Sequence, residues 1–278
     1  MSTFPSYFRY LFLLLVVVLF LPSQGMAQYA ETIRSGRPGQ SIGPFTTGAR
    51  VLQVQAGVDY GQYAFRKQFF GKTDGRVIGS DVVVRMGITE RFEMGIGVAY
   101  RNDLARTRSF AGESETLDQG VSAFSVRLRS NVYEGKGIIP SVGFQFNLGL
   151  PAVSKDFRPK QVAPKITVMT AQNLGKRFGL TTNWGAVWDG NSEIPEAFYI
   201  INIGFVITDF VSIFAEQYAN MGKGYWNGSV DGGFAFLINP DLQLDVLGGY
   251  GPFNVQDDWF VSTGVSWRIR FNERKKTE

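Results

Sequence analysis

Apolar and polar residues alternate with a period of two along most of the chain after residue 50. This period is typical of β-strands whose two faces meet different surroundings. The alternation is clearest in residues 92–101, where one face would suit lipid and the other holds glycine, alanine and charged residues. About twelve such segments follow one another. The pattern predicts an all-β fold in which residues 51–271 form antiparallel strands.

The connections between these segments alternate in length. The short ones are Thr89–Arg91, Glu134–Lys136, Gly175–Lys176, Thr208–Asp209 and Asn239–Asp241. The longer ones are Gly61–Gly75, Asn102–Asp118, Gly149–Ala163, Asp189–Glu196, Asn220–Asn227 and Gly251–Asp257. Outer-membrane barrels have this asymmetry because their periplasmic turns are short and their external loops are longer. We therefore predict a transmembrane antiparallel up-and-down β-barrel of about twelve strands, with both ends in the periplasm.

The first 27 residues have the features of a signal peptide. Arg9 precedes an apolar run from Tyr10 to Leu21, which is too short to cross a membrane as a helix. Gly25 and Ala27 then provide the small residues of a signal-peptidase site. We expect cleavage after Ala27 and export through the inner membrane to the bacterial outer membrane. The alternative is an uncleaved N-terminal anchor.

Two further segments flank the predicted barrel. Residues 28–50 are polar and rich in glycine, proline and serine. They form either a periplasmic N-terminal arm or a partial plug inside the barrel. Residues 272–278 are expected to form a charged periplasmic tail.

Composition narrows the chemistry that the chain can perform. It contains no histidine and no cysteine, which excludes Ser–His and Cys–His catalytic arrangements and His- or Cys-ligated metal sites. An Asp/Glu dyad, for example among Asp81, Glu93, Asp231 and Asp245, remains conceivable, but charged pairs inside a barrel are more often structural. We expect no catalytic residue, no metal and no cofactor. The net charge of +4 is spread along the chain, and this distribution argues against a nucleic-acid partner.

Charged residues on the inward faces of the predicted strands are the candidate functional residues. The basic ones are Arg85, Arg101, Arg127, Arg129, Arg268 and Arg270. The acidic ones are Asp59, Asp81, Glu93, Glu216, Asp231 and Asp245. Their signs are mixed, so no strong ion preference follows. They either line a narrow pore and tune what passes, or pair across the lumen and seal it.

The ends of the mature chain carry a family resemblance. The opening stretch IRSGRPGQSIGPFTTGARVLQVQAGVDY and the closing stretch DDWFVSTGVSWRIRF resemble the Bacteroidetes branch of a transporter-like outer-membrane barrel family. That family is labelled "putative MetA-pathway of phenol degradation". The resemblance spans residues 33–271 and implies an outer-membrane barrel linked to the uptake of small compounds, including aromatic ones. It supplies no active-site motif and no specific substrate.

Three functions are compatible with these patterns. The first is a passive channel or transporter for small solutes, aromatic or hydrophobic ones among them. The second is a non-conducting barrel that serves structure or surface interaction through its external loops. The third is an outer-membrane enzyme, which the missing histidine and cysteine disfavour. Outer-membrane lipid and, during biogenesis, the barrel-assembly machinery are the expected partners.

Overall fold

The computed structural model describes residues 32–67, 71–110, 112–136, 139–253 and 257–271. The proposed signal peptide and the charged tail lie outside these ranges. The strands are β1 (Val51–Lys67), β2 (Gly71–Gly87), β3 (Phe92–Ser109), β4 (Gly112–Tyr133), β5 (Ser141–Gly149), β6 (Ala163–Leu174), β7 (Phe178–Val187), β8 (Glu196–Thr208), β9 (Val211–Gly222), β10 (Tyr225–Asn239), β11 (Leu242–Tyr250) and β12 (Asp257–Arg270). A short 3₁₀ helix, η1 (Lys155–Phe157), precedes β6. In the described ranges, no helix is long and apolar enough to cross a membrane.

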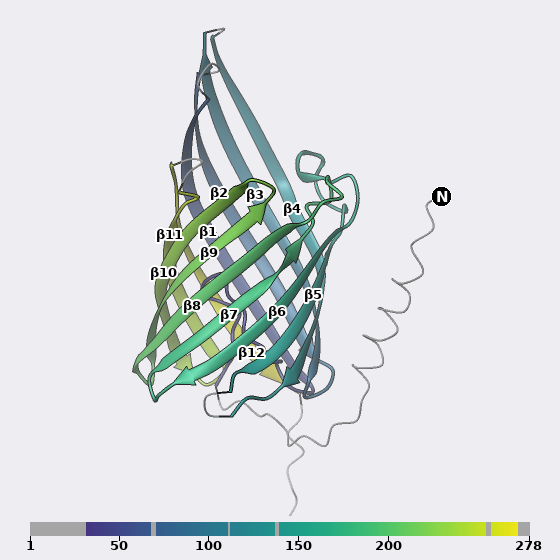
Figure 1. Cartoon of the computed structure of the whole chain (residues 1–278), viewed down its shortest axis with the longest axis vertical. Helices are drawn as coiled ribbons and strands as arrows, with labels where there is room; N and C mark the ends of the chain where they lie inside the picture. Colours follow the sequence, from purple (N-terminus) through teal and green to yellow (C-terminus); the bar gives the residue numbers. More distant parts are fainter. Residues whose placement is uncertain (1–31, 68–70, 111, 137–138, 254–256, 272–278) are drawn as a thin grey trace, which may run out of the picture.

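The twelve strands form one closed barrel (Figure 1). Each strand pairs antiparallel with the next, and β1 closes the sheet against β12 from Val51↔Arg270 to Ala64↔Asp257. Closure pairs the strand backbones without leaving an edge, which is what a sheet in lipid requires. The predicted fold class and strand number are therefore confirmed. We call the end where β1 begins and β12 ends the turn end, and the opposite end the loop end.

The barrel is polar inside and apolar outside. The residues buried in its interior include Gln53, Arg85, Glu93, Asn183 and Asp245. The exposed side chains of the outer wall are largely apolar, including Val82, Val84, Met86, Ile96 and Val98. Successive residues of a strand point to opposite faces, so the period of two in the sequence sorts each strand between lumen and lipid. This is the arrangement of a transmembrane barrel.

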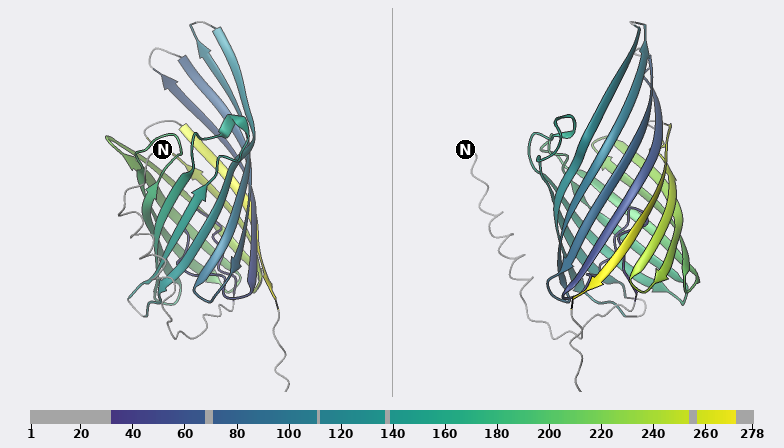
Figure 2. Two further views of the ribbon diagram at one scale, coloured as in Figure 1. Left: turned by 90° about the vertical axis from the view of Figure 1, so that its right-hand side faces the viewer. Right: turned by 180° about the vertical axis from the view of Figure 1, so that it is seen from behind.

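Three of the predicted longer connections are instead continued strands. β1 and β2 run through most of Gly61–Gly75, and β3 and β4 run through most of Asn102–Asp118. β9 and β10 likewise fill most of Asn220–Asn227. Figure 2 shows β1–β4 rising well beyond the other strands at the loop end.

The continued strands of β2–β4 were missed because they carry no apolar face. Cross-strand ion pairs stabilise them instead, including Arg106–Glu115 at 2.7 Å and Arg108–Glu113 at 2.8 Å. Beyond the lipid both faces of a strand can be polar, so the pattern resembles that of a loop. We call this part of β1–β4 the loop-end extension.

The lipid-facing wall makes a quantitative prediction. Ile96→Arg on β3 should destabilise the folded barrel by about 2–4 kcal/mol, because it places a charge against lipid. Leu117→Arg, in the loop-end extension of β4, is the matched control, since both side chains are about half exposed, at 51% and 49%. Urea unfolding in liposomes measures both. Equal destabilisation by the two substitutions would contradict the assignment of the lipid-facing wall.

Candidate functional site: the barrel lumen

The segment before β1 lies inside the barrel. Residues 32–50 form this luminal segment, drawn in purple within the barrel in Figure 1. It is tied to the turn end at both sides, because Ile33 N donates to Pro240 O at 2.8 Å and Arg50 N donates to Gly87 O at 3.1 Å. Between these points it contacts inward-pointing side chains around the wall. The lumen is therefore occupied by the protein's own chain.

Arg37 of the luminal segment bridges two carboxylates of the barrel wall. Its guanidinium lies 3.1 Å from Asp81 and 3.3 Å from the fully buried carboxylate of Asp245. Gly57 and Gly264 lie between these two aspartates in one pairing row of β2, β1, β12 and β11. A Cβ atom at either glycine would lie within 2.3 Å of the Arg37 side chain. Because both positions are glycine, the Arg37 side chain has room to lie against the wall.

A second anchor lies on β9, two strands from the β11 strand that carries Asp245. Glu216 on β9 accepts hydrogen bonds from Gln40 N at 2.6 Å and Ser41 N at 3.1 Å. Asn202 on β8 donates to the same carboxylate at 2.6 Å. Asp231 lies directly opposite Glu216 on β10 and is buried beside it. The carboxylate of Glu216 therefore fixes the position where the segment crosses the lumen.

Asn183 adds a third anchor through a reciprocal pair of hydrogen bonds. Ile42 N donates to its amide oxygen and its amide nitrogen donates to Ile42 O, both at 2.8 Å. Asn183 is fully buried. An asparagine amide has both a donor and an acceptor, so it can pair with one residue's backbone as a neighbouring strand would.

A buried charge cluster holds the end of the segment. Glu93 lies 3.1 Å from Arg85 and 3.4 Å from Arg129, and all three side chains are at most 5% exposed. Thr47 N donates to the second oxygen of Glu93 at 2.8 Å. The Glu93 carboxylate on β3 thus links β2, β4 and the luminal segment.

Three further candidates form pairs nearer the barrel ends. Arg268 and Arg270 both bond Asp241 at the turn end, at 2.6 and 2.8 Å. Arg101 pairs with Asp103 at 3.0 Å toward the loop end.

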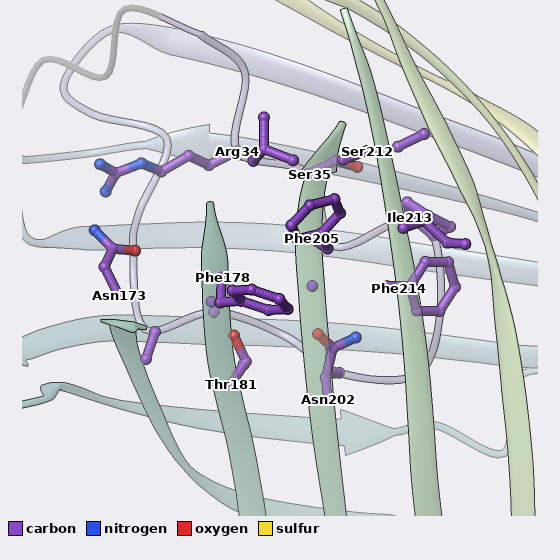
Figure 3. A pocket seen from close by; sticks show the side chains of 18 of the residues that line it. Arg34, Ser35, Asn173, Phe178, Thr181, Asn202, Phe205, Ser212, Ile213 and Phe214 are labelled. Atoms are coloured by element: carbon purple, nitrogen blue, oxygen red, sulfur yellow. The ribbon is translucent and has the colours of Figure 1, made fainter. Parts of the chain in front are cut away.

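Cavities lie on both sides of the luminal segment. On the turn-end side a cavity of about 540 Å³ is lined by Arg34, by residues of β6–β9 and by the turn that joins β6 to β7 (Figure 3). Figure 3 shows Asn173, Thr181 and Asn202 along this wall. On the loop-end side, cavities of about 280 and 360 Å³ share Asp59 and Phe260 in their linings. Arg37 lines both the 540 Å³ and the 280 Å³ cavity, so the luminal segment separates them.

The charges of the lumen are partly sorted by sign around the wall, and the buried Glu93 on β3 and Arg268 on β12 are exceptions. The acidic side lies on β9–β11 and β1–β2 and consists of Glu216, Asp231, Asp245, Asp59 and Asp81. The basic side lies on β2, β4 and β6 and consists of Arg85, Arg127, Arg129 and Lys165. The alternation pattern in the sequence identified most of these residues, but it did not predict how the positive and negative charges are distributed around the wall. Their separation depends on which strands become neighbours.

Several lumen residues were not among the sequence-based candidates. Arg37 lies in a glycine- and proline-rich stretch without strand periodicity. Lys165 begins a strand whose alternation is weak, and Asn183 and Asn202 are uncharged. The two asparagines could have been found from their alternation with apolar residues. No local signal marks Arg37 as a residue that reaches two aspartates.

Comparison with known proteins agrees with this architecture. The profile of the family described as "Putative MetA-pathway of phenol degradation" matches residues 35–269. The chain belongs to this family. The matched range covers the barrel of this phenol-degradation family member and most of its luminal segment. No curated protein sequence matches the chain.

Solved structures share the fold of this family member at low sequence identity. The COG4313 outer membrane channel from Pseudomonas putida F1 has a TM-score of 0.56 at 11% identity, over 78% of this chain and 95% of that one. The transport unit of the autotransporter AIDA-I from Escherichia coli has a TM-score of 0.56 at 12% identity, over 96% and 99%. The translocator domain of NalP from Neisseria meningitidis has a TM-score of 0.51 at 10% identity, over 78% and 88%. These similarities establish the barrel fold alone.

The Glu93 cluster makes a prediction about stability. Glu93→Gln should destabilise the barrel by about 3 kcal/mol, because it leaves two buried arginines without their carboxylate. Glu113→Gln is the matched control, since Glu113 also pairs with an arginine but its side chain is 75% exposed. That change should cost at most about 1 kcal/mol. The urea concentration at the midpoint of unfolding measures both variants. If the two midpoints coincide, the Glu93 cluster has no structural role.

Proposed function

We propose that the protein is a passive outer-membrane channel for small solutes, closed in the described state by its luminal segment. The observation that carries this proposal is the succession of cavities along a polar lumen. They lie on both sides of the luminal segment and meet at Arg37. A structural barrel would gain more from a lumen filled with side chains, because filled interiors pack to higher density.

The comparisons support the proposal and suggest the class of solute. The P. putida relative is described as an outer membrane channel, and the family description refers to phenol degradation. Small aromatic compounds are therefore the first solutes to test. The stretches at the two ends of the mature chain are the reason to assign the protein to the Bacteroidetes branch of the family.

Export and orientation belong to the same proposal. A signal peptide cleaved after Ala27 would deliver the chain to the periplasm. The barrel-assembly machinery would then insert it with the turn end facing the periplasm, as short turns indicate. The absence of histidine and cysteine supports transport rather than catalysis.

A non-conducting barrel is the second candidate. The anchors on Asp81, Asp245, Glu216, Asn183 and Glu93 favour it, because they hold the luminal segment at many points. The two functions differ in one respect: a channel must open when the luminal segment is displaced.

Planar-bilayer recording tests this difference. Deleting residues 33–46 should raise single-channel conductance several-fold over that of the full chain, because the segment that separates the cavities is gone. Arg37→Met should produce intermediate conductance through partial release. Arg108→Met, in the exposed loop-end extension, is the control and should behave as the unmodified protein.

If the folded deletion variant conducts no better than the control, the wall itself seals the lumen. The channel proposal would then fail in favour of the non-conducting barrel. Folding of each variant is checked independently by its resistance to unfolding in detergent.

A further inference from the structure

The inner face of the loop-end extension carries a cavity next to those of the lumen. This upper cavity, of about 510 Å³, is lined by residues of all four strands that include Tyr63, Phe65, Thr73, Thr107 and Thr116. Tyr63 also lines the 360 Å³ cavity on the loop-end side of the lumen. Asp59, Tyr63 and Phe65 lie at alternate positions of β1 and therefore share the lumen face. The upper cavity and the lumen cavity thus follow one another along the same wall.

Two aromatic rings form a surface along the upper cavity. The rings of Tyr63 and Phe65 are nearly parallel, at 12°, and their centroids are 6.3 Å apart. The Tyr63 ring extends across β2, because a Cβ atom at its pairing partner Gly75 would overlap the phenol ring. The Tyr63 hydroxyl group donates to Asp103 on β3 at 2.9 Å. The ring therefore lies along the wall, with one face on Gly75 and the other toward the cavity.

The polar groups around this aromatic surface change from its upper to its lower end. The upper cavity has three threonines and no charged residue among the described residues that line it. The hydroxyl groups of Thr73 and Thr107 are hydrogen-bonded at 3.0 Å. At the lower end, the 360 Å³ cavity contains the Arg101–Asp103 ion pair, at 3.0 Å. A hydroxyl group can donate and accept, whereas a guanidinium only donates and an ionised carboxylate only accepts.

These features match the chemistry of a neutral sugar. A pyranose ring has a face of C–H groups that packs on an aromatic ring, and a rim of hydroxyl groups that need donors and acceptors. An ion would meet no counter-charge among the described residues that line the upper cavity. An unsubstituted aromatic solute would leave the threonine hydroxyls and the Arg101–Asp103 pair unused. Both cavities lie within the range of about 300–1,000 Å³ that is typical of small-molecule sites.

We propose that the inner face of the loop-end extension binds neutral saccharides through Tyr63 and Phe65, with the Arg101–Asp103 pair at its lower end. The site lies on the lumen side of the wall, so its ligand is a dissolved sugar rather than the headgroup of a membrane lipid. The inference rests on the proposed channel function, because it names a class of solute that would enter at the loop end. It also gives a role to β1–β4 where they rise beyond the other strands (Figure 2).

Saturation-transfer NMR of the full-length protein tests the site, in a detergent that has no sugar headgroup. Methyl β-D-glucoside has a closed ring, and its ring protons should receive saturation because they contact the aromatic surface. Sorbitol has hydroxyl groups but no ring, so it should receive little. Phenol and tetramethylammonium chloride represent aromatic and cationic solutes. Neither should displace the glucoside at equal concentration.

Substitutions assign the binding to the two aromatic rings. Tyr63→Leu and Phe65→Leu retain an apolar side chain without a ring. Each should raise the dissociation constant for the glucoside about two- to tenfold, the range for loss of one aromatic contact. Tyr63→Phe retains the ring and should keep most of the affinity. Tyr100→Leu is the matched control, because it removes a tyrosine that is 47% exposed on the outer face of β3, and it should leave the dissociation constant unchanged.

Equal saturation of sorbitol and the glucoside would overturn the proposal. So would displacement of the glucoside by phenol or tetramethylammonium, or unchanged glucoside binding in both leucine variants. Conductance of the variant that lacks residues 33–46 tests the channel separately. If that variant conducts but the full-length protein does not bind the glucoside, the channel proposal stands and the saccharide site is removed. Glucoside binding without conductance would instead remove the channel and leave the saccharide site.

Discussion

Lipid offers no hydrogen-bond partners, and this constraint governs the whole molecule. Every backbone N–H and C=O within the membrane must bond to another part of the chain. The sheet meets this requirement by pairing β1 with β12 and leaving no edge. Closure then creates an interior that lipid cannot reach. That interior can hold polar residues, while the outer wall must be apolar.

A polar interior creates a second requirement, because its buried groups need partners of their own. The luminal segment supplies many of them. Its backbone donates to Glu216, Asn183 and Glu93, and the Arg37 guanidinium lies between Asp81 and Asp245. The segment has no regular secondary structure, so its own backbone groups also need external partners. The barrel wall and the luminal segment provide hydrogen-bond partners for each other, which explains why an irregular chain is stable inside the barrel.

This mutual satisfaction is incomplete. Among the described residues, both carboxylate oxygens of Asp231 and one of Asp245 are buried without a hydrogen-bond partner, although Arg37 reaches the acidic wall. Cavities remain on either side of the segment because it fills only the middle of the lumen. A chain that needed only a stable barrel would have little use for these spaces. A transported solute would bind in these cavities.

The sequence alone determined the fold class, the number of strands and the inward face of most strands. Each of these depends on the two-residue period, which is a local property of a strand between lipid and lumen. The candidate charges on that face, such as Glu93, Asp245 and Arg268, do lie in the interior.

Only the tertiary structure decided which charged residues lie close together, how far β1–β4 continue and where residues 32–50 lie. Closure and strand tilt set the pairing row that aligns Asp81 with Asp245, and no local pattern encodes that register. The β2–β4 part of the loop-end extension escaped detection because strands beyond the lipid need no apolar face. The position of residues 32–50 depends on contacts with strands distant in sequence, from Asp81 to Asp245. Periodicity therefore specifies how each strand faces its surroundings, whereas closure specifies which charges meet.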